Sequence, residues 1–209
     1  MNEAATLDCL VVEDDNEAFR DIQDALRARI PQIRQPVDRV ATVEAYLAQQ
    51  QEKFYDIAIV DLWLVDPATR KQDADHEGGL KVTAGLRAWN TDALVVIYSG
   101  HVDVRQTVLA MRNGAWDAIN KNENDAEELL ISSICEGLDC IKFLGSWFER
   151  HIHELSSRFP GEQVAVCRGE VIDHDLKLYE LTKRTLAAAA ECRVEHFLVP
   201  AKELPENHG

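Results

Sequence analysis

The sequence of 209 residues predicts an α/β protein in which a doubly wound, five-stranded parallel sheet is followed by a long helix and a small β-β-α-β module. Up to about residue 120, short apolar runs alternate with segments whose apolar residues recur every three or four positions. Some of these runs, such as 55–64, are apolar at both odd and even positions. That pattern is typical of strands buried on both faces of a parallel sheet. From residue 125 on, the pattern changes.

The apolar runs define five strands, and amphipathic segments define the helices that connect them. The predicted strands are 7–12, 37–41, 55–64, 93–100 and 117–120. The predicted connecting helices are 16–30, 42–51, about 80–89 and 104–114. Asn16 is expected to cap the first of these helices. Alternating strands and helices predict parallel pairing with right-handed crossovers and helices on both faces of the sheet.

Residues 125–159 contain no proline, and their apolar residues follow a spacing close to a heptad repeat. These apolar residues are Leu130, Ile134, Ile141, Leu144, Phe148 and Leu155. A continuous helix here would be on the order of 50 Å long and would suit pairing with a second copy of the chain. Gly137 and Gly145 leave a second interpretation open, in which two shorter helices pack back on the domain.

The motif FPGE at 159–162 marks a boundary. Beyond it, 163–173 predicts a hairpin that turns at RGE, 176–191 a helix and 194–200 a final strand. We therefore divide the chain into a domain at 1–124, a helical connector at 125–159 and a β-β-α-β module at 160–209.

Composition excludes some classes of partner. The formal net charge of -15 and the absence of a clustered Lys/Arg segment argue against nucleic-acid binding. No apolar run approaches the roughly 18 residues of a membrane span, and no basic region precedes an apolar one at the N-terminus. The five cysteines are odd in number and scattered, so we expect reduced thiols and a cytoplasmic location.

Polar side chains lie at or just beyond the carboxyl ends of four of the predicted strands. Glu13, Asp14 and Asp15 follow the first strand, and the others are Asp61, Ser99 and Lys121. Each alone has an ordinary explanation as a cap, a turn or a surface charge. Because ligands of doubly wound sheets bind at the carboxyl ends of the strands, the set together predicts one site.

The residue types in this set suit phosphoryl chemistry. A carboxylate cluster favours Mg²⁺, which also offsets the repulsion between adjacent acids. Beside such a metal, Asp61 can act as a nucleophile toward a phosphoryl group. The Lys121 ammonium and the Ser99 hydroxyl can then stabilise the phosphoryl oxygens.

Residues 5–125 resemble the receiver domain of two-component response regulators, a flavodoxin-like fold. The resemblance rests on VVEDD, DLWL, GGLKVTAGLR, VVIYSGH and GAWDAINK in that order. It implies that Asp61 is the phosphoacceptor and that Ser99 and Lys121 hold the phosphoryl group. It also implies a Mg²⁺ site made by Glu13, Asp14 and Asp61 with the backbone carbonyl of Trp63. The implied phosphoryl donor is a histidine kinase or a phosphotransfer protein.

The chain departs from the family pattern at three places. An insertion at 66–77 precedes Gly78, and its acids and His76 allow either a solvated loop or a second metal site. Ala118 occupies the position of the usual aromatic residue, and Asn122 that of the usual proline after Lys121. We therefore expect the signal to leave through the long helix that follows the fifth strand.

The sequence leaves two functional alternatives to a phosphorylatable regulator. An aspartyl-phosphate hydrolase characteristically carries a second Asp two positions after its nucleophile, where this chain has Trp63, so we do not expect an enzyme. A receiver-like interaction module that is never phosphorylated stays open. The acidic module at 160–209 does not read as a helix-turn-helix, so we expect output through protein contacts or a homodimer rather than through DNA.

Overall fold

A computed structural model describes residues 6–49, 53–64, 78–89, 93–185 and 194–200. The chain divides into two compact units, Met1–Gly137 and Leu138–Gly209. The division lies within the longest helix, α5 (Ala126–Arg158), so each unit contains one part of that helix.

The first unit contains the predicted five-stranded parallel sheet. Its strands are β1 (Cys9–Val12), β2 (Asp38–Val40), β3 (Ile57–Val60), β4 (Leu94–Ser99) and β5 (Asp117–Asn120). They are ordered β2-β1-β3-β4-β5 and all pairs are parallel. Every residue of β1 and β3 is buried, as their two-sided apolar pattern predicts.

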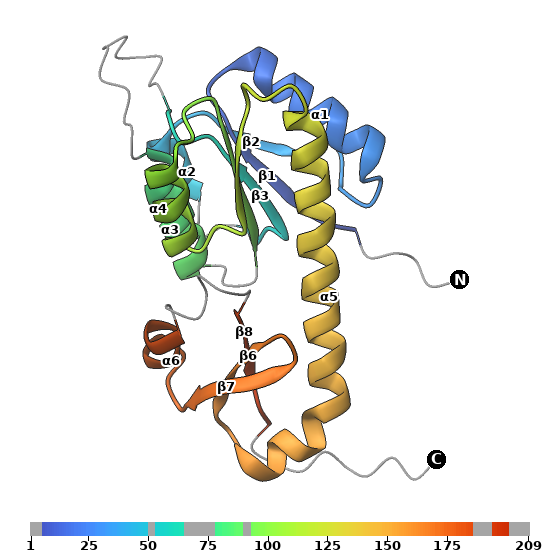
Figure 1. Cartoon of the computed structure of the whole chain (residues 1–209), viewed down its shortest axis with the longest axis vertical. Coiled ribbons are helices and arrows are strands. Elements are labelled where there is room, and N and C mark those ends of the chain that lie inside the picture. Colours follow the sequence, from blue (N-terminus) through green and yellow to red (C-terminus); the bar gives the residue numbers. More distant parts are fainter. Residues whose placement is uncertain (1–5, 50–52, 65–77, 90–92, 186–193, 201–209) are drawn as a thin grey trace. The chain divides into compact units, whose positions relative to one another are not determined.

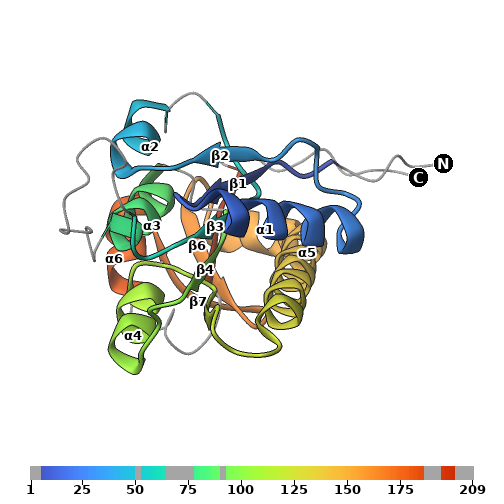
Figure 2. The same cartoon turned by 90° about the horizontal axis from the view of Figure 1, so that it is seen from above.

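Helices cover both faces of this sheet. The connecting helices are α1 (Asn16–Arg29), α2 (Val43–Gln49), α3 (Gly78–Trp89) and α4 (Val104–Arg112). Within this unit, α1 and the first turns of α5 lie on one face, and α2, α3 and α4 lie on the other (Figures 1 and 2). The predicted doubly wound fold is confirmed.

Asp15, rather than the predicted Asn16, caps α1. Its Oδ1 accepts hydrogen bonds from the backbone N–H groups of Glu17 at 2.7 Å and Ala18 at 2.8 Å. Asp15 has extended backbone angles, as an N-cap requires, whereas Asn16 is already helical. Residue type alone does not separate two adjacent cap-forming residues, so the sequence prediction was wrong by one position.

Strand β3 is shorter than the predicted strand at 55–64. It ends at Val60 because the Asp61 carboxylate accepts a hydrogen bond from the backbone N–H of Trp63 at 2.9 Å and turns the chain. Leu62 and Leu64 beyond this turn are still buried. Burial continues past the end of the strand. An apolar run in the sequence therefore cannot distinguish strand residues from buried residues of the loop that follows.

Helix α5 is one continuous helix of 33 residues, so neither Gly137 nor Gly145 breaks it. In the first unit, Leu130 and Ile134 of α5 are buried. Gly137 lies against β4: a Cβ at this position would lie only 2.4 Å from Cδ1 and 2.8 Å from Cδ2 of Leu94. The absence of a side chain at Gly137 therefore lets the helix approach the sheet.

The two glycines of α5 should respond oppositely to alanine. Gly137→Ala should lower the free energy of unfolding by roughly 1–3 kcal/mol, because the fully buried Leu94 must move. Gly145→Ala should raise it by roughly 0.5–1 kcal/mol, because nothing lies within 4 Å of the new Cβ and alanine favours helix. Urea denaturation followed by circular dichroism measures both changes. Shifts of the same sign would contradict this account of Gly137.

The second unit contains the predicted β-β-α-β module. Its elements are β6 (Gln163–Cys167), β7 (Glu170–Asp175), α6 (Leu178–Thr185) and β8 (Val194–Leu198). The strands form an antiparallel sheet ordered β7-β6-β8. The hairpin turns at Arg168 and Gly169, which both have positive φ, at 52° and 80°. Such angles match a two-residue hairpin turn, and glycine adopts them without strain.

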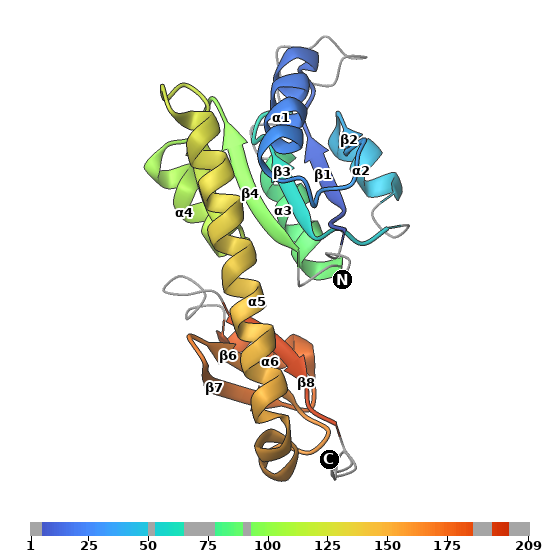
Figure 3. The ribbon, with the colours of Figure 1, turned by 90° about the vertical axis from the view of Figure 1, so that its right-hand side faces the viewer.

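The alternation of β6 explains how this small sheet is covered on both faces. Val164 and Val166 pack with Leu144 and Leu155 of α5, whereas Ala165 packs with Leu181 of α6 on the opposite face. Figure 3 shows the last turns of α5 against this sheet. The long helix thus covers one face of this sheet and α6 covers the other.

This packing accounts for the heptad-like pattern of α5. Leu130 and Ile134 are buried in the first unit and Leu144 and Leu155 in the second, and Phe148 stacks on Phe197 at 4.4 Å between ring centroids. The interpretation as two shorter helices is wrong. The apolar pattern is satisfied within one chain and does not require a partner helix.

Two further expectations concern cysteines and membranes. Cys9, Cys135 and Cys140 are free thiols, but Cys167 is disulfide-bonded, so the expectation of only reduced cysteines is wrong for Cys167. Cys192 lies outside the described residues.

None of the described helices is long and apolar enough to span a bilayer.

Candidate functional site at the carboxyl edge of the parallel sheet

The structure brings four of the predicted site residues into direct contact. Glu13 follows β1, Asp61 follows β3, Ser99 ends β4 and Lys121 follows β5, so all four lie at the carboxyl edge of the sheet. Glu13, Asp61 and Ser99 are buried and Lys121 is half-buried. The parallel strand order β1-β3-β4-β5 is what places residues so far apart in the sequence side by side.

Asp61 is the centre of this cluster. Its Oδ1 accepts hydrogen bonds from Ser99 Oγ at 2.6 Å and from the Trp63 backbone N–H at 2.9 Å. Its Oδ2 accepts a hydrogen bond from Lys121 Nζ at 2.7 Å. The Asp61 side chain is 11% exposed, and each carboxylate oxygen accepts at least one hydrogen bond. The Asp61 carboxylate is therefore oriented before any ligand binds.

Lys121 joins two carboxylates, because its Nζ also donates to Glu13 Oε2. Burial raises the pKa of Glu13, and attraction to Lys121 offsets only part of that rise. Burial lowers the pKa of Lys121, but the attraction of Asp61 and Glu13 outweighs this and raises the pKa overall. Lys121 is therefore a firmly protonated cation between the two acids.

Arg39 of β2 fixes the backbone at the end of β1. Its Nε donates to the carbonyl of Glu13 and its Nη2 to that of Asp14, both at 2.9 Å. The Asp15 N–H donates to Glu13 Oε1 at 3.0 Å, while the Asp15 carboxylate is used by α1. Asp14 is half-buried, and Asp15 is exposed. Arg39 was missed by the sequence analysis, because only the pairing of β2 with β1 brings it here.

The rings of two residues in the loops after β3 and β4 stack on each other. The rings of Trp63 and His101 are 3.4 Å apart between centroids and inclined by 14°. Trp63 follows Asp61 by two residues and His101 follows Ser99 by two, so the stack joins the loops after β3 and β4. Sequence reasoning identified Trp63 at this edge but missed His101, because a lone histidine in a loop gives no signal of its partner.

The sequence model of the response regulator receiver domain matches residues 9–132, which is more than half of the chain. The chain belongs to the response regulator receiver family. The match covers the parallel sheet and the start of α5 and ends before the second unit. No curated protein matches the sequence.

Solved structures with similar folds include receiver domains. A CheY-like receiver domain protein from Methanospirillum hungatei gives a TM-score of 0.51 at 19% identity, over 66% of this chain and 98% of that chain. The BeF3-activated DrrB receiver domain gives a TM-score of 0.51 at 19% identity, over 64% of this chain and 98% of that chain. NtrX from Brucella abortus gives 0.56 at 21% identity, over 71% of this chain and 30% of that chain. These similarities establish the receiver fold.

This receiver domain has unusual residues next to its site. Ala118 is half-buried on β5, at the position where the family resemblance implies an aromatic ring. Asn122, at the position of the usual proline, donates from Nδ2 to the carbonyl of Gly100 at 2.7 Å. The loops after β4 and β5 are therefore joined by a side chain that the usual proline could not replace.

The oxygen atoms at this edge fit Mg²⁺ chemically. Glu13, Asp14 and Asp61 provide carboxylates and Trp63 a backbone carbonyl, which are hard oxygen ligands. The three carboxylates outnumber the two cations at this edge, Lys121 and Arg39, so a bound cation would offset the remaining negative charge. Among the described residues, no three His, Cys, Asp or Glu side chains already form a metal-binding group. The second metal site considered at 66–77, with His76, lies outside the described residues.

Gly79 allows α3 to begin against the Asp61 loop. Its N–H donates to the Leu62 carbonyl at 3.1 Å, and a Cβ here would lie 2.2 Å from the Asp61 carbonyl oxygen and 2.6 Å from Leu62 Cα. Both are backbone atoms and cannot rotate away. The close approach of the helix and the acceptor loop therefore requires glycine.

Gly79→Ala should lower the free energy of unfolding by roughly 1–3 kcal/mol, because the backbone of the Asp61 loop must move. Gly100→Ala is the matched control at the same edge of the sheet. A Cβ there would lie 3.6 Å from the nearest atom, an ordinary contact, so it should leave the unfolding free energy almost unchanged. Urea denaturation distinguishes the two. Equal stability of both variants would contradict the close contact at Gly79.

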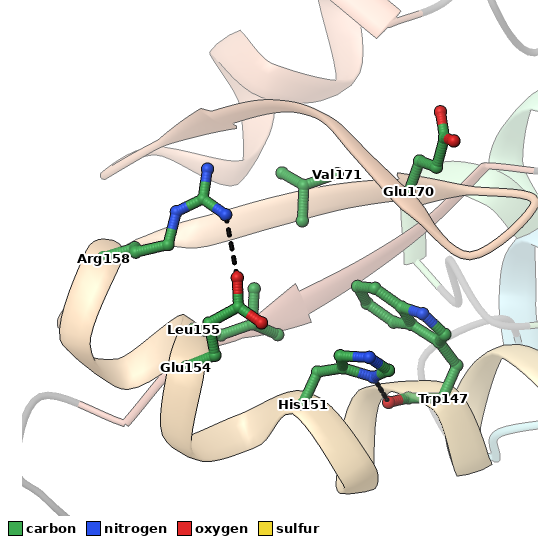
Figure 4. A pocket seen from close by; sticks show the side chains of 7 residues that line it. All are labelled: Trp147, His151, Glu154, Leu155, Arg158, Glu170 and Val171. Atoms are coloured by element: carbon green, nitrogen blue, oxygen red, sulfur yellow. Dashed lines mark hydrogen bonds and ion pairs between the residues drawn. The ribbon is translucent and has the colours of Figure 1, made fainter.

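The second unit contains a pocket of about 310 Å³ between the last turns of α5 and β7 (Figure 4). It is lined by Trp147, His151, Glu154, Leu155, Arg158, Glu170 and Val171. Arg158 is paired with Glu154 at 2.9 Å, and the Trp147 and His151 rings stack at 4.4 Å. The Arg158–Glu154 pair is exposed to solvent, whereas Glu13 and Asp61 at the sheet edge are buried, so we regard the sheet edge as the functional site.

Proposed function

We propose that this receiver domain is a phosphorylatable response regulator of a two-component or phosphorelay system, in which Asp61 accepts the phosphoryl group. The observation that supports this most directly is the Asp61 carboxylate itself. One oxygen is bound by the Ser99 hydroxyl and the other by the Lys121 ammonium. A carboxylate oriented by these two donors suits attack on a phosphoryl group.

In the proposed transfer, an Asp61 carboxylate oxygen forms a bond to phosphorus while the bond from phosphorus to the donor breaks. The donor is a phosphohistidine of a kinase or phosphotransfer protein, and its leaving nitrogen keeps the electron pair. Ser99 Oγ and Lys121 Nζ then donate to the phosphoryl oxygens. When bound by Glu13, Asp14, Asp61 and the Trp63 carbonyl, Mg²⁺ supplies the further positive charge that phosphoryl transfer needs.

In this proposal Asp61 is modified once per signal, so the protein is a signalling protein and not an enzyme with turnover. We also propose a cytoplasmic location. A hydrolase of aspartyl phosphate needs a general acid, and Trp63 provides none. The proposed output is protein–protein or self-association without DNA binding.

A homodimer through the second unit fits better than one through the long helix. On α5, Leu129 and Phe143 are 38% and 51% exposed, whereas Leu176 and Tyr179 beside and in α6 are 75% and 74% exposed. A faster-sedimenting species on phosphorylation would support self-association. Sequence-specific DNA binding by the phosphorylated chain would overturn the proposed output.

The test of phosphorylation is incubation of the full chain with acetyl phosphate, with and without Mg²⁺, followed by intact mass spectrometry. We expect a Mg²⁺-dependent gain of one phosphoryl group. No gain under either condition would favour the alternative, a receiver-like interaction module that is not phosphorylated.

Trp63→Ala should shorten the lifetime of the phosphorylated state several-fold. The Trp63 and His101 rings stack on each other in the loops that follow Asp61 and Ser99, and on this proposal they restrict the approach of water to the acyl phosphate. Trp63→Phe keeps a ring at this position and should change the lifetime less. Loss of the phosphoryl mass is followed with time after removal of acetyl phosphate. Equal rates for the wild type and Trp63→Ala would refute the shielding role.

A further inference from the structure

The loop after β5 holds the loop after β4 at two successive residues. The Lys121 N–H donates to the Ser99 carbonyl at 3.0 Å, and Asn122 Nδ2 donates to the Gly100 carbonyl at 2.7 Å. The Asn122 N–H in turn donates to Asn120 Oδ1 at 2.9 Å. The carbonyls of Ser99 and Gly100 are thus held by consecutive residues of one loop.

The same two loops provide the side chains that bind Asp61. Ser99 Oγ donates to Asp61 Oδ1, and Lys121 Nζ donates to Asp61 Oδ2. The Gly100 carbonyl that Asn122 holds belongs to the same peptide group as the His101 N–H, which lies 3.4 Å from Ser99 Oγ. Asn122 is therefore placed to influence where the Ser99 hydroxyl lies relative to Asp61.

Asn122 and Ser99 differ in how far they are exposed to solvent. Ser99 is fully buried, whereas Asn122 is exposed. An exposed side chain contributes little to the core, so its effect on the site comes through the hydrogen bond to Gly100.

We propose that Asn122 is a positioning residue for phosphoryl transfer, which holds the Gly100 carbonyl so that the Ser99 hydroxyl reaches Asp61 and the incoming phosphoryl oxygens. The inference rests on the proposed function. It assigns a role in this chain to a residue at a position where the family resemblance implies proline.

The first test compares Asn122→Ala with Asn113→Ala. Asn113 is a matched control, because its Nδ2 also donates to a backbone carbonyl, that of Leu109, at 2.8 Å, but at the end of α4. We expect Asn122→Ala to slow labelling by acetyl phosphate with Mg²⁺ by roughly two- to tenfold, the usual effect of one hydrogen bond. Asn113→Ala should label at the wild-type rate.

The second test asks whether Asn122 acts through Ser99. In a Ser99→Ala background, adding Asn122→Ala should produce no further decrease in rate, because the hydroxyl that Asn122 positions is already absent. An equal further decrease in that background would show that Asn122 acts elsewhere and would overturn the inference. Labelling of Asn122→Ala at the wild-type rate would also overturn the inference.

A third measurement does not depend on phosphorylation. Amide hydrogen exchange of Lys121, whose N–H donates to the Ser99 carbonyl, should be several-fold faster in unphosphorylated Asn122→Ala than in the wild type or Asn113→Ala. Unchanged exchange would overturn the positioning role. If the wild type itself takes no phosphoryl group, the proposed function fails, and this exchange measurement alone decides the structural role of Asn122.

Discussion

Asp61→Asn should abolish the Mg²⁺-dependent gain of a phosphoryl group from acetyl phosphate. The asparagine amide cannot act as the attacking carboxylate oxygen, and its NH₂ group would face Lys121 Nζ, which now donates to Asp61 Oδ2. Because no other group replaces the nucleophile, the expected loss is complete. Intact mass spectrometry of the variant and the wild type, treated in parallel, measures it.

Asp56→Asn is the control for this substitution. Asp56 lies just before β3, at the opposite end of the strand from Asp61, and its Oδ2 accepts a hydrogen bond from the Asp8 N–H at 2.7 Å. This variant should be labelled like the wild type. Labelling that persists in Asp61→Asn would place the acceptor elsewhere and overturn the assignment, provided that circular dichroism shows both variants folded.

Asp14→Asn should also abolish Mg²⁺-dependent labelling, whereas Asp15→Asn should lower the rate by at most about fivefold. On the proposed function, the Asp14 carboxylate is a ligand of the metal, and the neutral amide is a much poorer one. The Asp15 carboxylate instead accepts from the N–H groups of Glu17 and Ala18, a role that asparagine performs equally well.

These adjacent residues form a matched pair, because both substitutions remove one negative charge from the same loop. The initial labelling rate is measured at several Mg²⁺ concentrations for each variant. Loss of labelling in Asp14→Asn that high Mg²⁺ partly reverses would also support its role as a ligand. Equal losses in the two variants would show that only the general charge of the loop matters, which contradicts the assignment.

Much of the sheet was predictable because its signals are local. Strands β1 and β3 are apolar on both faces, and each ends where the first carboxylates appear. The convergence of Glu13, Asp61, Ser99 and Lys121 followed from one rule, since parallel strands bring their carboxyl ends to the same edge. The site residues were therefore predictable as a group before their contacts were known.

The sequence predictions were wrong where one local pattern is compatible with two structures. The N-cap of α1 is Asp15 and not Asn16, because the backbone angles decide between two capable residues. The heptad-like residues of α5 fit a partner helix equally well on paper, but Leu144 and Leu155 pack against the second unit's own sheet. Gly137 was read as a possible break, whereas it is a place of close contact with Leu94.

By itself, the sequence determined the order of helices and strands and the residues at the functional edge, because periodicity and strand ends are properties of neighbouring residues. Only the tertiary structure decided what those residues touch. Arg39 on the carbonyls of Glu13 and Asp14, His101 on Trp63 and Asn122 on Gly100 are contacts between loops and strands distant in sequence. Such contacts depend on strand order and on the paths of the loops, which no local pattern specifies.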